Sequence, residues 1–389
     1  MISTRSFVVL GVALALLGMV VGLQREFGLA IRASSALAGV IPGDPPTPLA
    51  LLPAPRVREV NYRTARGTPV PADLYLPPRT NPGPALILMP GVLPDVRTYA
   101  PLVKVADGFA RAGFAVLVPE GLDYQHYRVL PEDIDALVAG FEWLAAQPEG
   151  DSARLGFVGF SVGGSLALVA AADPRIASEV AMVTTVGAYY NLDSVLQAVT
   201  TRHTDAIDGT PEPYQPDDLA WLVVRNTLVG NLPDRADWEV LFEIFSQPTA
   251  APDAEALARA DLSALSPAGR ATFDLFVNRD PSAAARLTRR LRTRLPSLFE
   301  SFSPEAHLDA VKAPVHLLHE RSDQFVPFSE SIRLERALGG EPRARLALID
   351  ILQHVEISAP DLSPQTLVGS YLPGLWALFT FSSEALGRL

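Results

Sequence analysis

Residues 155–172 read LGFVGFSVGGSLALVAAA, and this stretch decides the fold. Its first six residues form a short apolar run typical of a buried strand, and the residues after position 164 are apolar with helical character. Between the two lies GFSVG (residues 159–163), which fits the pattern G-x-S-x-G. A sharp strand-to-helix turn holds such a serine in a strained conformation and needs small neighbours to close. We therefore predict that Ser161 is a nucleophile and that Gly159 and Gly163 let the turn close.

Similar apolar runs lie on both sides of this turn. ALILMPG (85–91) and FAVLVPE (114–120) precede it, each followed by a stretch with helical spacing, and VHLLH (315–319) and RLALID (345–350) follow it. Short apolar runs that alternate with helices indicate an α/β fold with a mostly parallel, doubly wound sheet. Residues 56–76 alternate around Gly67 instead, which predicts an antiparallel hairpin ahead of that sheet.

A serine hydroxyl is a weak nucleophile until a base takes its proton, so Ser161 needs a histidine and an acid. Asp323 and His354 follow the last two apolar runs, and sites in open α/β sheets form beyond the carboxyl ends of the strands. We predict a triad of Ser161, Asp323 and His354. His354 is then general base and general acid, while Asp323 holds its tautomer. Glu320 and Asp350 are alternative acids.

The other histidines are weaker candidates for the base. His316 and His319 lie within or at the edge of a predicted strand, so we interpret them as packed or capping residues. His126 follows the run at 114–120 and is a candidate pocket residue. No H-x-x-x-H motif and no carboxylate cluster indicates a metal site.

The segments GFSVGG (159–164) and VKAPVHLLHERSDQFVP (311–327), with the late His354, resemble the α/β-hydrolase superfamily, especially its bacterial serine esterase and dienelactone-hydrolase-like branches. The resemblance covers roughly residue 56 to the C-terminus and is weak between about 194 and 303. It implies hydrolysis of carboxylic esters, thioesters or amides without a cofactor. Two positions depart from the family pattern: Pro90 replaces a usual histidine before Gly91, and Glu320 replaces a frequent glycine. Because the nucleophile is serine, the cysteine chemistry of true dienelactone hydrolases does not transfer.

An oxyanion hole needs two N–H donors aimed at the developing alkoxide, and each is worth about 3–4 kcal/mol when it is preorganised. One donor is expected from Val162, the residue after the nucleophile. The other is expected from the loop after ALILM, where the motif glycine Gly91 precedes Val92. Pro90 has no N–H and cannot donate. We therefore predict Val92 and Val162 as the two donors.

Residues 194–303 have helical texture and no strand signal, and hydrolases of the resembling fold carry a lid at this place. We expect a helical lid there, inserted into one domain that covers 56–389. Four arginines of this segment fall on one helical face, and three leucines fall on roughly the opposite one. They are Arg286, Arg289, Arg290 and Arg294, against Leu287, Leu291 and Leu295. The arginines contact either anionic headgroups or an acidic substrate, or they form a solvated lid surface.

The N-terminal segment differs from the rest of the chain. Residues 7–23 run without a charge, which is at the short end of a membrane-spanning helix. We predict a single-pass anchor over 1–40 with the bulk of the chain outside the cytoplasm, followed by a Pro-rich spacer over 41–55. The alternative is a cleaved secretory signal, for which the small-residue site ALA (36–38) is the candidate.

The composition excludes several classes of function. Among 389 residues there is no cysteine, so a disulfide framework, a thiolate metal site and a cysteine nucleophile are excluded. The formal net charge is -11 and only two residues are lysine, which argues against binding of nucleic acid. We expect a serine hydrolase that cleaves small acyl or ester substrates. The alternatives are an acyltransferase or thioesterase with the same triad, or a catalytically silent binding protein with a hydrolase fold.

Overall fold

The structure is a computed structural model that describes residues 53–78, 82–247 and 250–350. It also describes short C-terminal pieces at 352–353, 356–357, 380–382, 384–385 and 387. The predicted anchor (1–40), most of the predicted spacer (41–55) and His354 lie outside the described residues. Within the described ranges, no helix combines the length and the hydropathy that crossing a bilayer requires.

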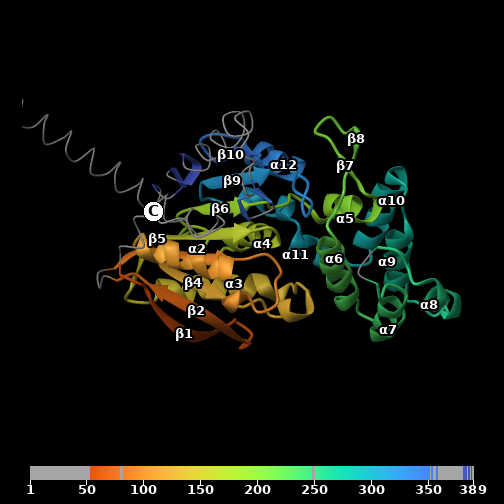
Figure 1. The fold of residues 1–389 in the computed structure, drawn as a ribbon, viewed down its shortest axis with the longest axis horizontal. Helices are drawn as coiled ribbons and strands as arrows, with labels where there is room; N and C mark the ends of the chain where they lie inside the picture. Colours follow the sequence, from red (N-terminus) through yellow and green to blue (C-terminus); the bar gives the residue numbers. More distant parts are fainter. Residues whose placement is uncertain are drawn as a thin grey trace, which may run out of the picture.

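The described strands form one large sheet with the order β1-β2-β4-β3-β5-β6-β9-β10 (Figure 1). Strands β1 and β2 form an antiparallel hairpin, β2 is also antiparallel to β4, and every other pair is parallel. The predicted hairpin and the predicted mostly parallel sheet are therefore confirmed. The strands are β1 (Arg56–Arg63), β2 (Pro69–Leu76), β3 (Gly83–Met89), β4 (Ala115–Pro119), β5 (Gly150–Phe160), β6 (Val183–Val186), β9 (Val315–Glu320) and β10 (Ala344–Ile349).

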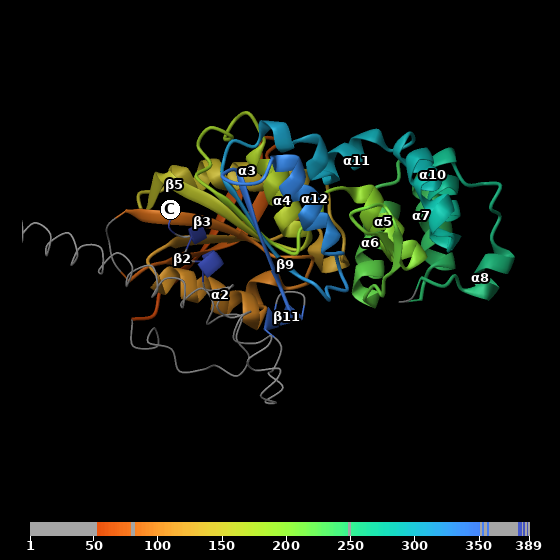
Figure 2. The same cartoon turned by 90° about the horizontal axis from the view of Figure 1, so that it is seen from above.

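Helices cover both faces of this sheet, as Figure 2 shows. They are α2 (Ala100–Arg111) on one face and α3 (Glu132–Ala145), α4 (Val162–Ala171) and α12 (Ser329–Leu338) on the other. The central strands are buried on both sides as a result: Leu86, Ile87 and Leu88 of β3 are all 0% exposed. This double burial explains why the strands read as continuous apolar runs instead of alternating ones.

A helical insertion lies between β6 and β9, and it groups at one end of the sheet (Figure 1). It contains α5 (Leu192–Thr201), α6 (Asp218–Gly230), α7 (Arg235–Ile244), α8 (Ala254–Arg259), α9 (Pro267–Val277), α10 (Pro281–Arg292) and α11 (Pro296–Phe302). The sequence pattern indicated no strand here, and that expectation was wrong. A short hairpin of β7 (His203–Asp205) and β8 (Pro211–Pro213) follows α5, and strands of three residues with two prolines give no recognisable alternation.

The remaining described elements are short. Strands β11 (Leu352–Gln353) and β12 (Glu356–Ile357) pair with each other on either side of residues 354–355. Single 3-10 turns occur at η2 (Val96–Thr98), η3 (Tyr124–His126), η4 (Pro304–Ala306) and η5 (Leu308–Ala310).

The two ends of the insertion are tied together at its base. The N–H of Leu192 donates to Ser303 Oγ at 3.1 Å, and the N–H of Glu305 donates to the carbonyl of Tyr190 at 3.0 Å. The insertion also has its own aromatic cluster, in which the Trp221 ring lies 4.8 Å from that of Phe276 and 5.9 Å from that of Phe245. The insertion is thus a helical unit with its own aromatic core, and hydrogen bonds join the segments at its two ends.

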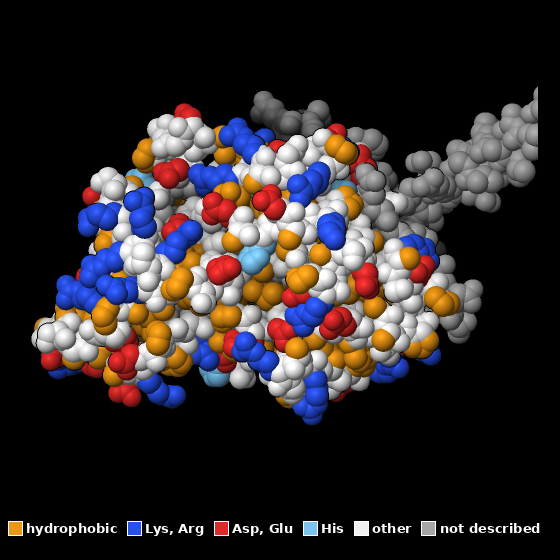
Figure 3. Space-filling view, turned by 180° about the vertical axis from the view of Figure 1, so that it is seen from behind, with side chains coloured by type: hydrophobic (Ala, Val, Ile, Leu, Met, Phe, Trp, Pro, Cys, Tyr) orange, Lys and Arg blue, Asp and Glu red, His pale blue; other side chains and the backbone are white. Residues whose placement is uncertain are grey.

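The predicted arginine face lies on the outer side of α10 and just beyond it. Figure 3 shows basic side chains gathered at the end of the molecule that the insertion forms. All four arginines of this face are exposed, and Arg290 pairs with Asp274 at 2.8 Å. Leu287, Leu291 and Leu295 are buried, so the predicted division into a charged and an apolar face holds.

Candidate active site

Ser161 occupies the turn between β5 and α4. Its φ of 53° and ψ of -130° are unusual for a residue with a side chain. Such a conformation costs about 1–3 kcal/mol and persists only where the surrounding structure imposes it. Here the N–H of Ser161 donates to the carbonyl of Val186 at 2.7 Å, which ties the turn to β6. The strained turn that the sequence motif predicted is therefore present.

Two of the motif glycines, Gly159 and Gly163, are required because the main chain passes close to them. A Cβ at Gly163 would lie 2.2 Å from the Pro90 carbonyl oxygen, and one at Gly159 would lie 2.5 Å from Gly164 Cα. A Cβ at Gly91 would lie 3.2 Å from Ser161 Cβ. The loop after β3 consequently packs directly against the serine turn, which leaves no room for a Cβ at Gly159 or Gly163 and makes one tight at Gly91.

The two predicted oxyanion donors lie on either side of this contact. Val162 is the first residue of α4, and amides in the first turn of a helix have no acceptor within the helix. Val92 follows Gly91 in the loop that touches Ser161. Both valines line the same cavity as Ser161. Their N–H groups remain the predicted donors.

Asp323 lies in the loop after β9 and is 4% exposed. Its Oδ1 accepts the N–H groups of Phe325 at 2.7 Å and Val326 at 3.1 Å. Its Oδ2 lies 3.5 Å from His319 Nε2. The loop thus holds a buried carboxylate at the carboxyl edge of the sheet. Because His354 lies outside the described residues, the triad of Ser161, Asp323 and His354 stays a prediction.

The two alternative acids have different surroundings. Glu320, the last residue of β9, is buried, and its Oε1 accepts the hydroxyl of Ser322 at 3.2 Å. The Asp350 side chain is 59% exposed and lies 3.7 Å from Arg321. A surface carboxylate would be screened by solvent and would orient a histidine poorly, which favours the buried Asp323 and Glu320 over Asp350.

The described histidines are packed or at the surface. His319 is fully buried, with Nδ1 2.7 Å from Ser331 Oγ and Nε2 3.0 Å from the Val326 carbonyl oxygen. The ring of His316 packs edge-on against Phe381. Both agree with the predicted packing role.

His126 does not line the cavity that contains Ser161. Its side chain is 69% exposed, and Nδ1 lies 2.7 Å from Asp123 Oδ1. This candidate is therefore not a pocket residue, because the turn after β4 directs its side chain toward solvent. Among the described residues, no group of three or more potential ligands is arranged to hold a metal ion.

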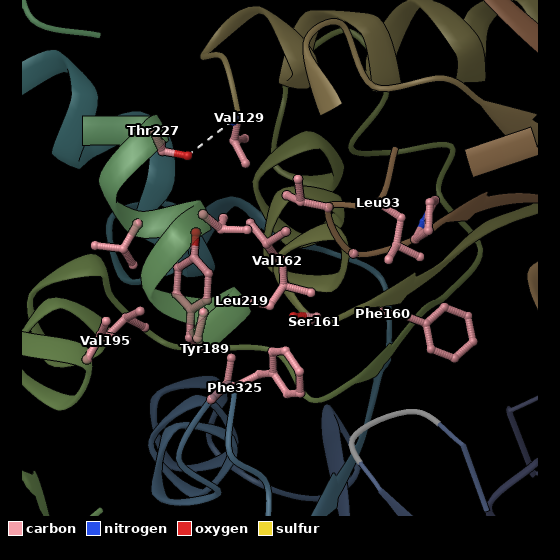
Figure 4. A pocket seen from close by; sticks show the side chains of 18 of the residues that line it. Leu93, Val129, Phe160, Ser161, Val162, Tyr189, Val195, Leu219, Thr227 and Phe325 are labelled. Carbon is pink, nitrogen blue, oxygen red and sulfur yellow. Dashed lines mark hydrogen bonds between the residues drawn. The ribbon is translucent and has the colours of Figure 1, made fainter. Parts of the chain in front are cut away.

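A cavity of about 400 Å³ opens at Ser161 (Figure 4). Its walls come from the loops after β3 and β9, from α2, and from the insertion helices α5 and α6. Nearly all its side chains are hydrocarbon, among them Leu102, Val105, Val195, Leu196, Val199, Leu219, Ala220, Val223, Val224 and Leu228. Figure 4 shows Val195 of α5 and Thr227 of α6 across the cavity from Ser161. The sequence analysis did not predict this wall of the cavity. The apolar spacing of residues 219–229 was the signal that could have indicated it.

The loop after β4 brings Val129 to the cavity, and hydrogen bonds hold it there. The N–H of Val129 donates to Thr227 Oγ1 of α6 at 3.1 Å (Figure 4). The carboxylate of Asp133, 1% exposed, accepts the N–H groups of Leu122 and Leu130, each at 2.8 Å. Burial raises the pKa of Asp133 to about 6, although these two bonds act in the opposite direction.

This raised pKa predicts a pH dependence of stability. The folded state binds the Asp133 proton more tightly than the unfolded state, so ionisation between about pH 4 and 6 lowers the free energy of unfolding by about 3 kcal/mol. Asp133→Asn removes this titration. The free energy of unfolding of this variant, relative to that of wild type, should therefore rise by about 3 kcal/mol from pH 4 to pH 7. Urea denaturation at both pH values measures it, with the exposed Glu142→Gln of α3 as control. A stability difference that does not change with pH would contradict the assignment.

The comparisons with known proteins agree with this architecture. No protein-family model matches the chain. It is 36% identical over 118 residues to mouse (Mus musculus) acyl-coenzyme A thioesterase 3, which is 29% of this chain and 25% of that protein. It is also 36% identical over 123 residues to mouse mitochondrial acyl-coenzyme A thioesterase 2, covering 30% and 25% of the two. These matches span about a quarter of the relatives' length.

Among solved structures, the chain is similar to a puromycin-hydrolyzing peptidase of Mycobacterium tuberculosis. The TM-score is 0.52 at 18% sequence identity, and the match covers 89% of this chain and 41% of that one. This likeness, the mostly parallel sheet and the serine turn after β5 together define one class: the chain has the α/β-hydrolase fold.

Proposed function

We propose that the chain is a serine hydrolase that cleaves carboxylic esters through an acyl-enzyme. Ser161 Oγ attacks the carbonyl carbon while His354 takes its proton, and the N–H groups of Val92 and Val162 bind the oxyanion. His354 then returns the proton to the departing alcohol, and water releases the acyl group by the same steps. Asp323 orients His354. The observation that carries this proposal is the strained Ser161 in the wall of an apolar cavity.

The cavity supports an extended hydrocarbon chain as the acyl part of the substrate. Its lining has few polar groups, and each buried methylene contributes about 0.8 kcal/mol, which is roughly a fourfold change in kcat/KM. A panel of p-nitrophenyl esters graded by acyl length should therefore show kcat/KM rising with length until the cavity is filled. Equal rates for acetyl and long-chain esters would contradict an acyl role for this cavity.

A single larger side chain in the cavity wall should move that length optimum. Ala220 of α6 lines the cavity and is 8% exposed, so Ala220→Phe would occupy space that an acyl chain needs. The expected result is an optimum at shorter esters, with a loss of about fourfold per excluded methylene. Ala236→Phe is the matched control, because Ala236 of α7 is exposed and lies outside the lining. If Ala220→Phe and wild type prefer the same acyl length, the acyl chain does not bind in this cavity.

Thioester hydrolysis is the second candidate activity. The similarity to two acyl-coenzyme A thioesterases favours it, although it covers under a third of the chain. The same triad would serve, since a thioester presents the same carbonyl carbon. An acyl-coenzyme A and a p-nitrophenyl ester of equal acyl length separate the two activities through their kcat/KM values. Transfer of the acyl group to an added alcohol instead of water would indicate an acyltransferase.

The proposal also includes the N-terminal segment and the insertion. We infer that residues 1–40 anchor the chain in a membrane as a single span, with the bulk outside the cytoplasm, and that the insertion acts as a lid over the cavity. The uncharged run at 7–23 supports the anchor, and the contribution of α5 and α6 to the cavity wall supports the lid. After alkaline carbonate extraction, the full chain should remain in the membrane pellet. A shortened chain in the medium would support the secreted alternative.

A further inference from the structure

The arginine face of the insertion has no part in the function proposed above. Arg286, Arg289 and Arg290 are exposed residues of α10, and the exposed Arg294 follows this helix directly. Arg290 pairs with Asp274 at 2.8 Å. Within the described ranges, no acid lies at ion-pair distance from the other three arginines. The insertion therefore presents three cationic groups whose charge no described acid pairs with.

The charge of this stretch is opposite to that of the rest of the chain. Residues 279–294 contain six arginines and one acid, Asp280, which is a net charge of +5. Because the whole chain has a net charge of -11, all other residues together carry -16. Figure 3 shows the basic side chains gathered at the end of the molecule that the insertion forms. Such an asymmetry attracts the protein to an anionic surface at one place and repels it elsewhere, which selects one orientation.

The shape and composition of the arginine face indicate the kind of partner. None of its arginines lines the cavity at Ser161 or the hollow beside the β7–β8 hairpin, whereas sites for small molecules are concave. Helix α10 contains no aromatic residue, and aromatic anchors dominate the affinity of many protein–protein interfaces. Cations spread along a helix without a pocket suit anionic lipid headgroups, which form an extended charged surface.

Helix α10 is also joined to the wall of the cavity at Ser161. Arg292 of α10 pairs with Asp193 in the first turn of α5. Helix α5 in turn supplies Val195 and Val199 to the lining of the cavity. A surface that holds α10 consequently also fixes the position of a helix that borders the cavity.

We propose that the arginine face docks the insertion on the headgroups of anionic phospholipids. Each arginine near an anionic lipid surface adds about fivefold to the docked population, so the three unpaired arginines together add about a hundredfold. The attraction is electrostatic and should vanish at high salt, where the screening length falls to about 3 Å. This docking rests neither on ester hydrolysis nor on the predicted anchor over 1–40.

Energy transfer from a labelled chain to labelled lipid tests the docking. Because the chain has no cysteine, Ala285→Cys provides a single labelling site, on an exposed position of α10. The full chain is reconstituted with vesicles of phosphatidylcholine alone or mixed with phosphatidylglycerol, and a headgroup-labelled lipid is the acceptor. Transfer should be stronger in the vesicles with phosphatidylglycerol, and high salt should remove the difference.

A triple variant on the same labelled chain tests the arginines themselves. It is Arg286→Gln/Arg289→Gln/Arg294→Gln. The ratio of docked to undocked chain should fall about a hundredfold, so transfer with phosphatidylglycerol should drop to the value for phosphatidylcholine alone. The three side chains are exposed and form no ion pair with described residues, so the variant is expected to fold, which an unchanged Tm verifies.

A second triple variant has the same net charge but changes another surface. Arg56→Gln/Arg58→Gln/Arg63→Gln removes three exposed arginines of β1 and should dock as wild type does. An equal loss of transfer in this control would show that net charge governs the approach, and the arginine face would not be a docking site.

Three further outcomes are decisive. Equal transfer with and without phosphatidylglycerol would overturn the proposal, and so would full transfer in the α10 triple variant. If lipid has no effect but wild type alone binds polyglutamate, the arginine face binds an acidic protein and the lipid proposal is wrong. Energy transfer does not depend on catalysis, so these results stand even if the chain hydrolyses no ester.

Discussion

Ser161→Ala is expected to lose all labelling by a fluorophosphonate probe and about a million-fold in kcat on the best ester of the panel. The reason is that Ser161 is the predicted nucleophile, and the strained turn presents it to the cavity. Mass spectrometry of the labelled wild type should locate the adduct on Ser161. Ser152→Ala is the matched control, since Ser152 is an exposed serine of the same strand β5. Ser161→Ala labelled as well as wild type would remove the catalytic proposal.

Two further results of the same assay separate the alternatives. His354→Ala should label far more slowly than wild type, because the serine then has no base, and unchanged activity in this variant would contradict the triad. An intact wild-type chain that never labels would support the catalytically silent binding protein. Pro90 before Gly91 was the sequence feature that motivated this alternative.

Glu330→Ala is expected to lower the free energy of unfolding by about 3–5 kcal/mol, because it leaves a charge and several donors without a partner. Glu330 of α12 is 0% exposed. Its Oε2 accepts the N–H of Tyr190 at 3.0 Å and the hydroxyl of Ser194 at 2.7 Å, and its Oε1 pairs with Arg333. These bonds join the sheet domain to the start of the insertion. In Glu330→Ala the insertion should therefore unfold before the sheet domain does.

Urea denaturation measures this effect, with Glu335→Ala of the same helix as the control. Glu335 is only partly buried, and a change within about 0.5 kcal/mol is expected for it. Limited proteolysis under native conditions should cut Glu330→Ala between α5 and α11 before the sheet domain is attacked. Equal stability of the Glu330→Ala and Glu335→Ala variants would show that the carboxylate does not hold the insertion.

Much of the sheet was predictable from the sequence because its signals are local. The apolar runs at 85–91 and 114–120 are strands, since a strand buried on both faces has no polar position. The serine turn was predictable for the same reason: G-x-S-x-G places small residues where backbone contacts leave no room for a Cβ. Asp323 was placed in a loop by the end of its apolar run, and the structure has it there.

Other features either leave no readable pattern in the sequence or depend on segments far apart in the chain. His126 was a candidate for the pocket from its place after a strand, but the direction of its side chain depends on the 3-10 turn and on its contact with Asp123. The β7–β8 hairpin is too short to have its own pattern. The cavity at Ser161 forms only where α2, α5 and α6 meet the loop of Ser161, so no single stretch of sequence describes it.

The sequence by itself determined the main strands of the large sheet, the position of Ser161 and the glycines that its turn requires, because these follow from residues adjacent in the chain. Only the tertiary structure decided that Glu330 joins α12 to the insertion and that helices of the insertion complete the cavity at Ser161. These features arise from contacts between segments far apart in the chain, and burial and hydrogen bonding across such distances leave no periodic signal in the sequence.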